Sequence, residues 1–426
     1  MAGDLMIGQK IFCRRKQKGL TQEQLAHGIC SISHLSKIEN GHELPGADIL
    51  AHLCKRLGTS SADILRDDTE VLFQSLYKWY ASVNNRDETK AAELAGIIRR
   101  QAESTHDSEA LLYWKLFRVW YLLYLRKTEE AGSLLEEICP YRERLQTKAG
   151  YFFHLFSGFY HCLTEDYLQA LGHLLDAEER MEESGGSDPE LYYQMALVNM
   201  NLHRTYYSIE SAGKAADHYT KELNYIRTID CEILLSVNKA RLKQFAQAEK
   251  HLNHAREASS LLSSDMHAAV IYHNYGYLKY CQGEVLDSLP FFIKSKHLGE
   301  SRQYEERIRT AYCLGRAYYE LKNFETAGRW ISQGKEMAIR HGLNEFYLHF
   351  KVLAFRNTGS LDLDYEMLLK NEVIPYFTEK QLWHHAANYA ELLAEYYASA
   401  NRYKWSAHYF SFVNKSREKI YEWTPC

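Results

Sequence analysis

The chain has 426 residues, of which 46% are hydrophobic and 25% charged, with a formal net charge of -4. This length exceeds one compact core, so the sequence predicts at least two domains or an array of repeats. The composition is typical of a folded globular protein. The lack of an apolar run of about 18 residues excludes a membrane-spanning helix, and the first residues carry no secretory signal. We therefore expect a cytoplasmic protein.

Nine cysteines are scattered singly along the chain, without a Cys-x-x-Cys pair. An odd total with this spacing favours reduced structural thiols over a disulfide framework or a zinc site. The sequence shows no Gly-rich phosphate loop, nucleophile elbow or cluster of metal ligands. We therefore expect no metal ion, no cofactor and no enzymatic activity.

The charge is unevenly distributed. The first 65 residues contain eight Lys and Arg against six Asp and Glu, so the excess of acidic residues lies entirely in the remainder. This balance excludes a chain that coats nucleic acid along its whole length. A weakly basic head on an acidic body suits a protein that contacts DNA with one small module.

Residues 20–41 have the pattern of a helix-turn-helix. Thr21, followed three residues later by Gln24, predicts a capping box that opens a short helix. Asn40-Gly41 supplies the left-handed stop that ends the second helix. The apolar positions that two packed helices require are Leu25, Leu35 and Ile38.

The second helix of a helix-turn-helix enters the major groove of DNA. Because each residue turns the helix by about 100 degrees, an inward Leu35 and Ile38 leave other side chains outward. The predicted contacts to bases, with Gln22 also able to meet a phosphate, are Gln22, Ile32, Ser33, Ser36 and Lys37. The predicted phosphate contacts are Arg14, Lys16 and Lys18. The alternative is that the basic residues form a solvated helix face.

The segment from Ile7 to Leu65 resembles the lambda-repressor and Cro-like family of helix-turn-helix domains. This resemblance implies that Arg15 and Glu39 pair inside the domain. The turn Gly28-Ile29-Cys30-Ser31 is one residue shorter than the common turn of that family. We therefore predict a DNA-binding domain over residues 1–65, a linker over 66–70, and a second domain over 71–426.

The second domain is predicted to be all-α, because apolar residues recur at three- and four-residue intervals and the chain has only six prolines. A small residue recurs about every 40 residues, and it marks the point where two antiparallel helices approach. We place these anchors at Ala92, Ala131, Ala170, Ala248, Ser288, Ala327 and Ala407, and roughly at Ala212 and Glu366. The pattern resembles the tetratricopeptide repeat, which implies about nine helix pairs in a right-handed solenoid with a concave wall. The alternative is an irregular helical bundle.

The combination of a Cro-like head and a long repeat array resembles the peptide-sensing RRNPP regulators of Gram-positive bacteria, the group of Rap, Rgg, NprR, PlcR and PrgX. Its length and repeat number are most similar to NprR-like members. The resemblance implies quorum sensing: a short signalling peptide in the repeat groove controls the binding of double-stranded promoter DNA by a homo-oligomer, dimer or tetramer. It also implies an alternative, in which the peptide-free chain sequesters a sporulation response regulator through its first repeats, around Trp79 to Trp120. A Rap-like hydrolytic role would need one placed glutamine, such as Gln101 or Gln146.

The predicted peptide site lies in the middle repeats. Asparagine offers a donor and an acceptor to an extended backbone, and arginine captures a carboxylate. The inward positions that fit these roles are Asn201, Arg204, His273, Asn274, Tyr277, Arg309 and Arg316. The alternative for each asparagine is a bond within its own helix. The histidines His384, His385, His154 and His161 have no carboxylate or cysteine at ligand spacing, so we interpret them as surface or groove residues.

Overall fold

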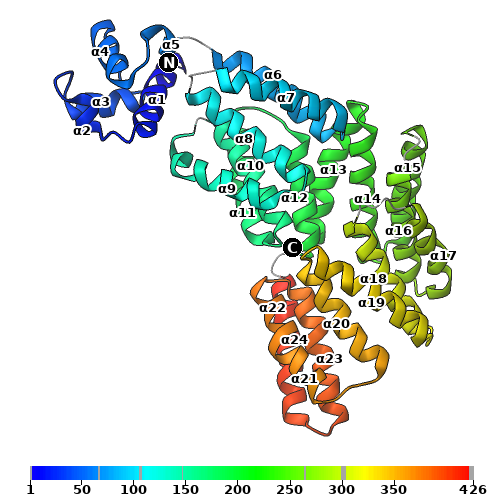
Figure 1. Ribbon diagram of the computed structural model, residues 1–426. Helices are drawn as coiled ribbons and strands as arrows, with labels where there is room; N and C mark the ends of the chain where they lie inside the picture. Colours follow the sequence, from blue (N-terminus) through cyan, green and yellow to red (C-terminus); the bar gives the residue numbers. More distant parts are fainter. Residues whose placement is uncertain are drawn as a thin grey trace. The chain divides into compact units, whose positions relative to one another are not determined.

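The computed structural model describes residues 2–65, 68–104, 108–145, 147–262, 265–298 and 304–421, and every element in these ranges is helical (Figure 1). The predicted fold class is confirmed: an N-terminal helix-turn-helix is followed by a helical-repeat solenoid. None of the helices that the structure describes combines the length and apolar character needed to span a bilayer.

The head consists of five helices: α1 (Ala2–Gln17), α2 (Gln22–Ala26), α3 (Ile32–Glu39), α4 (Ala47–Leu57) and α5 (Ser61–Leu65). The capping box is present, with the Thr21 hydroxyl accepting from the Gln24 amide and the Gln24 side chain accepting from the Thr21 amide. The predicted apolar positions, together with Ile11 of α1 and Leu53 of α4, are all fully buried in the head core. Burial of these side chains holds the two helices of the motif together.

The body contains nine helix pairs in the described residues, as the period of the sequence predicts. The pairs are α6 (Asp68–Asn84) and α7 (Glu88–Ser104), α8 (Ser108–Tyr124) and α9 (Thr128–Ile138), α10 (Thr147–Leu163) and α11 (Tyr167–Glu183), α12 (Pro189–Asn201) and α13 (Thr205–Lys221), α14 (Tyr225–Arg241) and α15 (Phe245–Leu262), α16 (Asp265–Cys281) and α17 (Val285–Leu298), α18 (Tyr304–Glu320) and α19 (Phe324–Arg340), α20 (Asn344–Thr358) with α21 (Leu363–Leu368) and α22 (Ile374–Glu379), and α23 (Trp383–Ser399) with α24 (Tyr403–Tyr421). Residues 66 and 67 of the predicted linker lie outside the described residues, and residues 68–70 belong to α6.

The chain divides into two compact units. One comprises Met1–Thr164 and Leu175–Ser187, and the other comprises Glu165–Leu174 and Asp188–Cys426. The head and the first repeats therefore belong to one unit, while the predicted peptide residues all belong to the other.

The predicted anchors are buried in seven of the nine pairs, from Ala131 to Glu366. The first and last predictions are wrong by one residue, because Ala92 and Ala407 are exposed while Ala91 and Ser406 are buried. A shift of one residue turns a side chain by about 100 degrees and moves it out of the helix interface. In the first pair the Trp79 indole donates to the Ala91 carbonyl at 2.9 Å, which fixes the correct register.

A second small residue shows how closely the helices approach. A Cβ on Gly334 of α19 would lie 2.1 Å from the fully buried ring of Phe350, so Gly334→Ala is expected to cost about 1–3 kcal/mol through overpacking. Gly172→Ala is the matched control, because nothing lies within 4 Å of the added methyl in the middle of α11. Thermal unfolding of the two variants should show a lower melting temperature for the first and an equal or higher one for the second. Equal melting temperatures would contradict this packing.

Candidate DNA-binding and peptide-binding sites

The recognition helix α3 presents the predicted outward face. Its N-cap Ser31 accepts a hydrogen bond from the His34 amide at 3.1 Å. Ile32 is 48% exposed, although an isoleucine is normally buried. Ser33 and Lys37 are exposed, while Ser36 is half-buried and accepts from the Asn40 amide group. The outward face of α3 is therefore accessible to DNA bases. The individual base contacts stay predictions.

A buried carboxylate, Glu39 at the end of α3, joins the three helices of the motif. The Arg15 guanidinium of α1 donates to both Glu39 oxygens, at 2.6 and 2.8 Å, which gives the bidentate pair that the Cro-like resemblance implies. Arg15 also donates to the Leu20 carbonyl. Gln22 of α2 donates to Glu39 Oε2 at 2.7 Å. The side-chain amide that the sequence predicts to contact DNA therefore already has a partner inside the head. These bonds orient α2 and α3 relative to α1.

The predicted phosphate contacts Arg14, Lys16 and Lys18, in and just after α1, have neighbours in different parts of the head. Bonds from Ser60 lower the pKa of Asp63, and Arg14 adds a smaller electrostatic contribution, which places Arg14 towards α5. Lys18 lies by the end of α4, where it donates to the Arg56 carbonyl at 3.5 Å. Lys16 lines a hollow with Gln22 and Pro140, in the compact unit that contains the head and the first repeats. Lys37 alone among the predicted basic contacts belongs to α3, and it lies 4.0 Å from Glu43.

Repeats of the second unit that are distant in sequence contact one another. The His203 ring, in the turn after α12, stacks on His384 of α23 with centroids 3.9 Å apart. The Tyr376 hydroxyl of α22 donates to Glu165 at 2.8 Å. The turns after α10 and α12 therefore contact α22 and α23.

Three of the predicted peptide residues lie half-buried on α16 and α18. The Arg316 guanidinium lies over the rings of Tyr280 and Tyr312, at 4.8 and 5.7 Å from their centroids. Arg309 is on the same helix, two turns earlier. Burial raises the pKa of Tyr277 to about 12, so its hydroxyl stays protonated and remains a donor at neutral pH. These groups could bind an anionic or peptide ligand.

The other four predicted residues make contacts within the fold. Asn201 and Asn274 each donate to the carbonyl four residues earlier in their own helices, at 3.1 and 2.9 Å, which is the alternative noted for them. His273 is 7% exposed and bonds to Thr310, and burial lowers its pKa. Arg204 occupies the N-cap position of α13 and stacks over Tyr207 at 4.4 Å. Their binding of a peptide stays a prediction.

Sequence reasoning missed Arg241 at the end of α14. Its Nη1 donates to the Met200 carbonyl at 2.6 Å, while its buried Nε has no hydrogen-bond partner among the described residues. Arg241 lies seven residues before the Ala248 anchor. None of the predicted inward positions has this offset: Tyr277 and Arg316, for example, lie eleven residues before their anchors, and Arg204 lies eight before Ala212.

The interpretation of the histidines as lacking a carboxylate is wrong in two places. His385 Nε2 lies 3.7 Å from Glu345 Oε1, which comes from the preceding helix pair. His154 Nδ1 lies 3.3 Å from Asp176. Spacing along the chain cannot show such contacts, because the partners are 40 and 22 residues apart in sequence.

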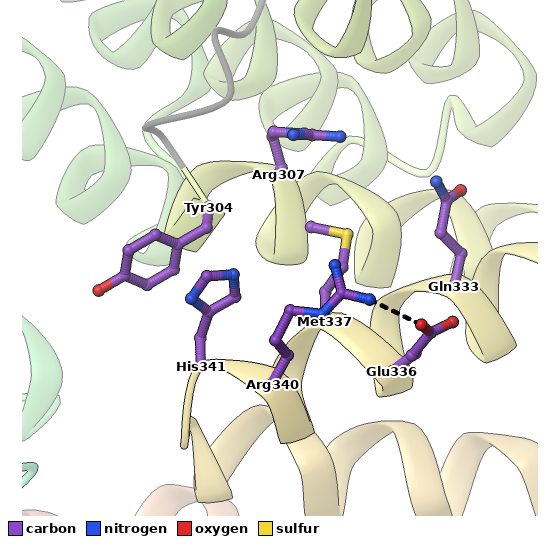
Figure 2. Close-up of a pocket in the computed structure, with 7 residues that line it drawn as sticks. All are labelled: Tyr304, Arg307, Gln333, Glu336, Met337, Arg340 and His341. Atoms are coloured by element: carbon purple, nitrogen blue, oxygen red, sulfur yellow. Dashed lines mark hydrogen bonds and ion pairs between the residues drawn. The ribbon is translucent and has the colours of Figure 1, made fainter.

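A separate surface hollow lies between α18 and α19 (Figure 2). It is lined by Tyr304, Arg307, Gln333, Glu336, Met337, Arg340 and His341. The Arg340 guanidinium donates to Glu336 at 2.8 Å, and the rings of Tyr304 and His341 stack with centroids 4.0 Å apart. None of the seven is a predicted peptide residue, so this hollow is not the predicted site.

Comparison with known proteins supports both parts of the architecture. A family model described as Helix-turn-helix matches residues 14–64. The chain is 28% identical to the Transcriptional activator NprA of Geobacillus stearothermophilus, over 91% of this chain and 97% of that protein. It is 21% identical to the Response regulator aspartate phosphatase I of Bacillus subtilis, over 82% of this chain and 92% of that protein.

Two solved structures show the same fold. One is a Rap protein complexed with Competence and Sporulation Factor, with a TM-score of 0.74 and 22% identity over 83% of this chain and 99% of that chain. The other is NprR in complex with its cognate peptide NprX, with a TM-score of 0.72 and 22% identity over 83% of this chain and 100% of that chain. The fold and the head define a helix-turn-helix protein with a helical-repeat body. Over most of its length the chain is similar in sequence to the activator NprA and in fold to Rap and NprR.

The Glu39 carboxylate gives a direct test of the head. Glu39→Gln leaves the buried Arg15 charge without its counterion, so we expect the head to lose about 3–5 kcal/mol of stability. Glu43→Gln is the control, since an exposed pair such as Lys37 and Glu43 contributes less than about 1 kcal/mol. Amide hydrogen exchange in α1 and α3 of the full chain measures both changes. Unaltered exchange in the first variant would show that Glu39 does not hold the motif together.

Proposed function

We propose that this protein is a cytoplasmic quorum-sensing transcription regulator. A short signalling peptide, bound in the repeat groove of the second unit, controls its DNA binding and oligomeric state. The overall resemblance to a named transcriptional activator over 91% of the chain supports the regulatory role. The fold of NprR, solved in complex with its peptide, supports peptide binding by the repeats. The role is one of binding rather than catalysis.

The observation that carries the peptide part of this proposal is a set of half-buried arginines in one unit. Arg241, Arg309 and Arg316 come from α14 and α18, and the Nε of Arg241 is buried without a hydrogen-bond partner among the described residues. A buried donor of this kind needs an acceptor. A peptide carboxylate or carbonyl oxygen would supply it, and a bidentate arginine contact would favour an acidic group.

The DNA part of the proposal rests on the open face of α3. We assign residues 1–65 to double-stranded promoter DNA and residues 71–426 to peptide binding and self-association. Two heads of a homo-oligomer must match two half-sites about one helical turn, roughly 34 Å, apart. A dimer or tetramer whose arrangement depends on the peptide would therefore switch operator binding.

A second candidate function is the capture of a response regulator by the peptide-free chain. The similarity to a response regulator aspartate phosphatase over 82% of this chain favours it. Trp79 and Trp120 are 1% and 3% exposed, so they support the first repeats from inside and other side chains would form the contact surface. Gln101 is exposed on α7, whereas Gln146 lies outside the described residues.

Light scattering and a promoter-fragment shift assay, with synthetic peptides encoded just downstream of this gene, test the main proposal. We expect a micromolar peptide to change both the mass and the shift. Arg316→Ala should weaken the peptide response roughly 10- to 100-fold, because a charged hydrogen bond contributes about 1.5–3 kcal/mol. DNA binding without peptide should stay unchanged.

Arg340→Ala is the matched control, since this arginine is exposed and pairs with Glu336 outside the groove. It should respond like the unaltered protein. Identical DNA binding with every peptide would contradict peptide control. Peptide-reversible capture of a purified response regulator, with no effect on DNA, would favour the second candidate.

A further inference from the structure

Three potential metal ligands converge where α20 and α23 meet. Glu345 and His349 are four residues apart on α20, and His385 comes from α23. Glu345 Oε1 lies 3.4 Å from His349 Nε2 and 3.7 Å from His385 Nε2. The three ligand atoms all lie within 4.8 Å of one another. His349 is buried and the other two are half-buried.

The spacing fits a small divalent ion. Zinc binds histidine nitrogen and carboxylate oxygen at about 2.0–2.2 Å in tetrahedral geometry, which separates neighbouring donor atoms by roughly 3.3–3.6 Å. The two distances to Glu345 are already close to this range. Two histidines and one carboxylate also match the ligand type that zinc uses in open sites, where water takes the fourth position.

The surroundings orient the central imidazole. The Nδ1 of His349 is hydrogen-bonded to the Tyr389 hydroxyl, which leaves Nε2 directed at Glu345. The rings of Phe377 and Tyr312 stack on His349 with centroids 5.2 and 5.3 Å away. An outer partner that fixes the ring and tautomer of a ligating histidine is a common feature of metal sites.

We propose that Glu345, His349 and His385 bind one divalent transition-metal ion of the zinc class. The ion would cross-link α20 to α23. It would also steady the segment in which His384 stacks on His203 of a distant repeat. This inference does not depend on the peptide or on DNA. The competing outcome is a hydrogen-bonded cluster of Glu345 and the histidines that takes no metal.

Calorimetric titration of the chelator-treated full chain with zinc tests the site. We expect one equivalent to bind and to raise the melting temperature. Glu345→Gln and His385→Asn should each weaken binding at least 100-fold, and Tyr389→Phe should weaken it about 10-fold through the lost support of His349. His254→Asn is the control, because this half-exposed histidine lies 3.7 Å from Glu232, away from the cluster. It should bind zinc like the unaltered protein.

The unaltered protein provides a readout that needs no variant. Cobalt(II) at this site should give the visible bands of a nitrogen and oxygen ligand set, without a thiolate charge-transfer band. A thiolate band, no stoichiometric zinc, or undiminished binding by Glu345→Gln and His385→Asn would overturn the proposal. If Glu345→Gln does not fold, His385→Asn and the cobalt spectrum still decide between the metal site and the hydrogen-bonded cluster.

Discussion

The close approach of two helices at one small buried side chain is the constraint on which the body depends. Alanine or serine occupies this position in eight of the nine described pairs, and it is fully buried in the pairs from Ala131 to Ala327. Side chains of this size let neighbouring backbones pack at short range and leave larger rings to fill the next interface. In the exception, the buried Glu366 has hydrogen bonds from Tyr397 and Arg402, so its charge is compensated.

Local sequence signals predicted most of the fold. The Thr21 capping box and the apolar positions of α2 and α3 act within one helix or one turn, and the period near 40 residues spans one helix pair. The two anchor errors, at Ala92 and Ala407, occurred at the terminal repeats, where one side of the pattern has no neighbour to compare. An error of one residue in the anchor position changes which side of the helix is predicted to be buried. In the first pair, the hydrogen bond from Trp79 to the Ala91 carbonyl shows the correct position.

The candidate sites were less predictable, because their geometry comes from contacts between repeats. The amide groups of Asn201 and Asn274 use their own helices, a competition that residue type alone does not settle. Arg241 contacts Met200, 41 residues away, and Glu345 reaches His385 across 40 residues. The repeat period and the residue types show which polar side chains each repeat carries. The three-dimensional stacking of repeats decides which of them meet.

In the proposed function the repeats of one compact unit sense the peptide, and α3 of the other unit recognises DNA. Hydrogen exchange over the full chain, with and without the peptide that alters its promoter binding, tests this central claim most directly. The proposed function predicts that the peptide slows exchange in α14, α16 and α18, whose side chains form the proposed groove, and leaves exchange in the core of the head unchanged. Protection confined to the head or to the first repeats, with none in these three helices, would contradict it.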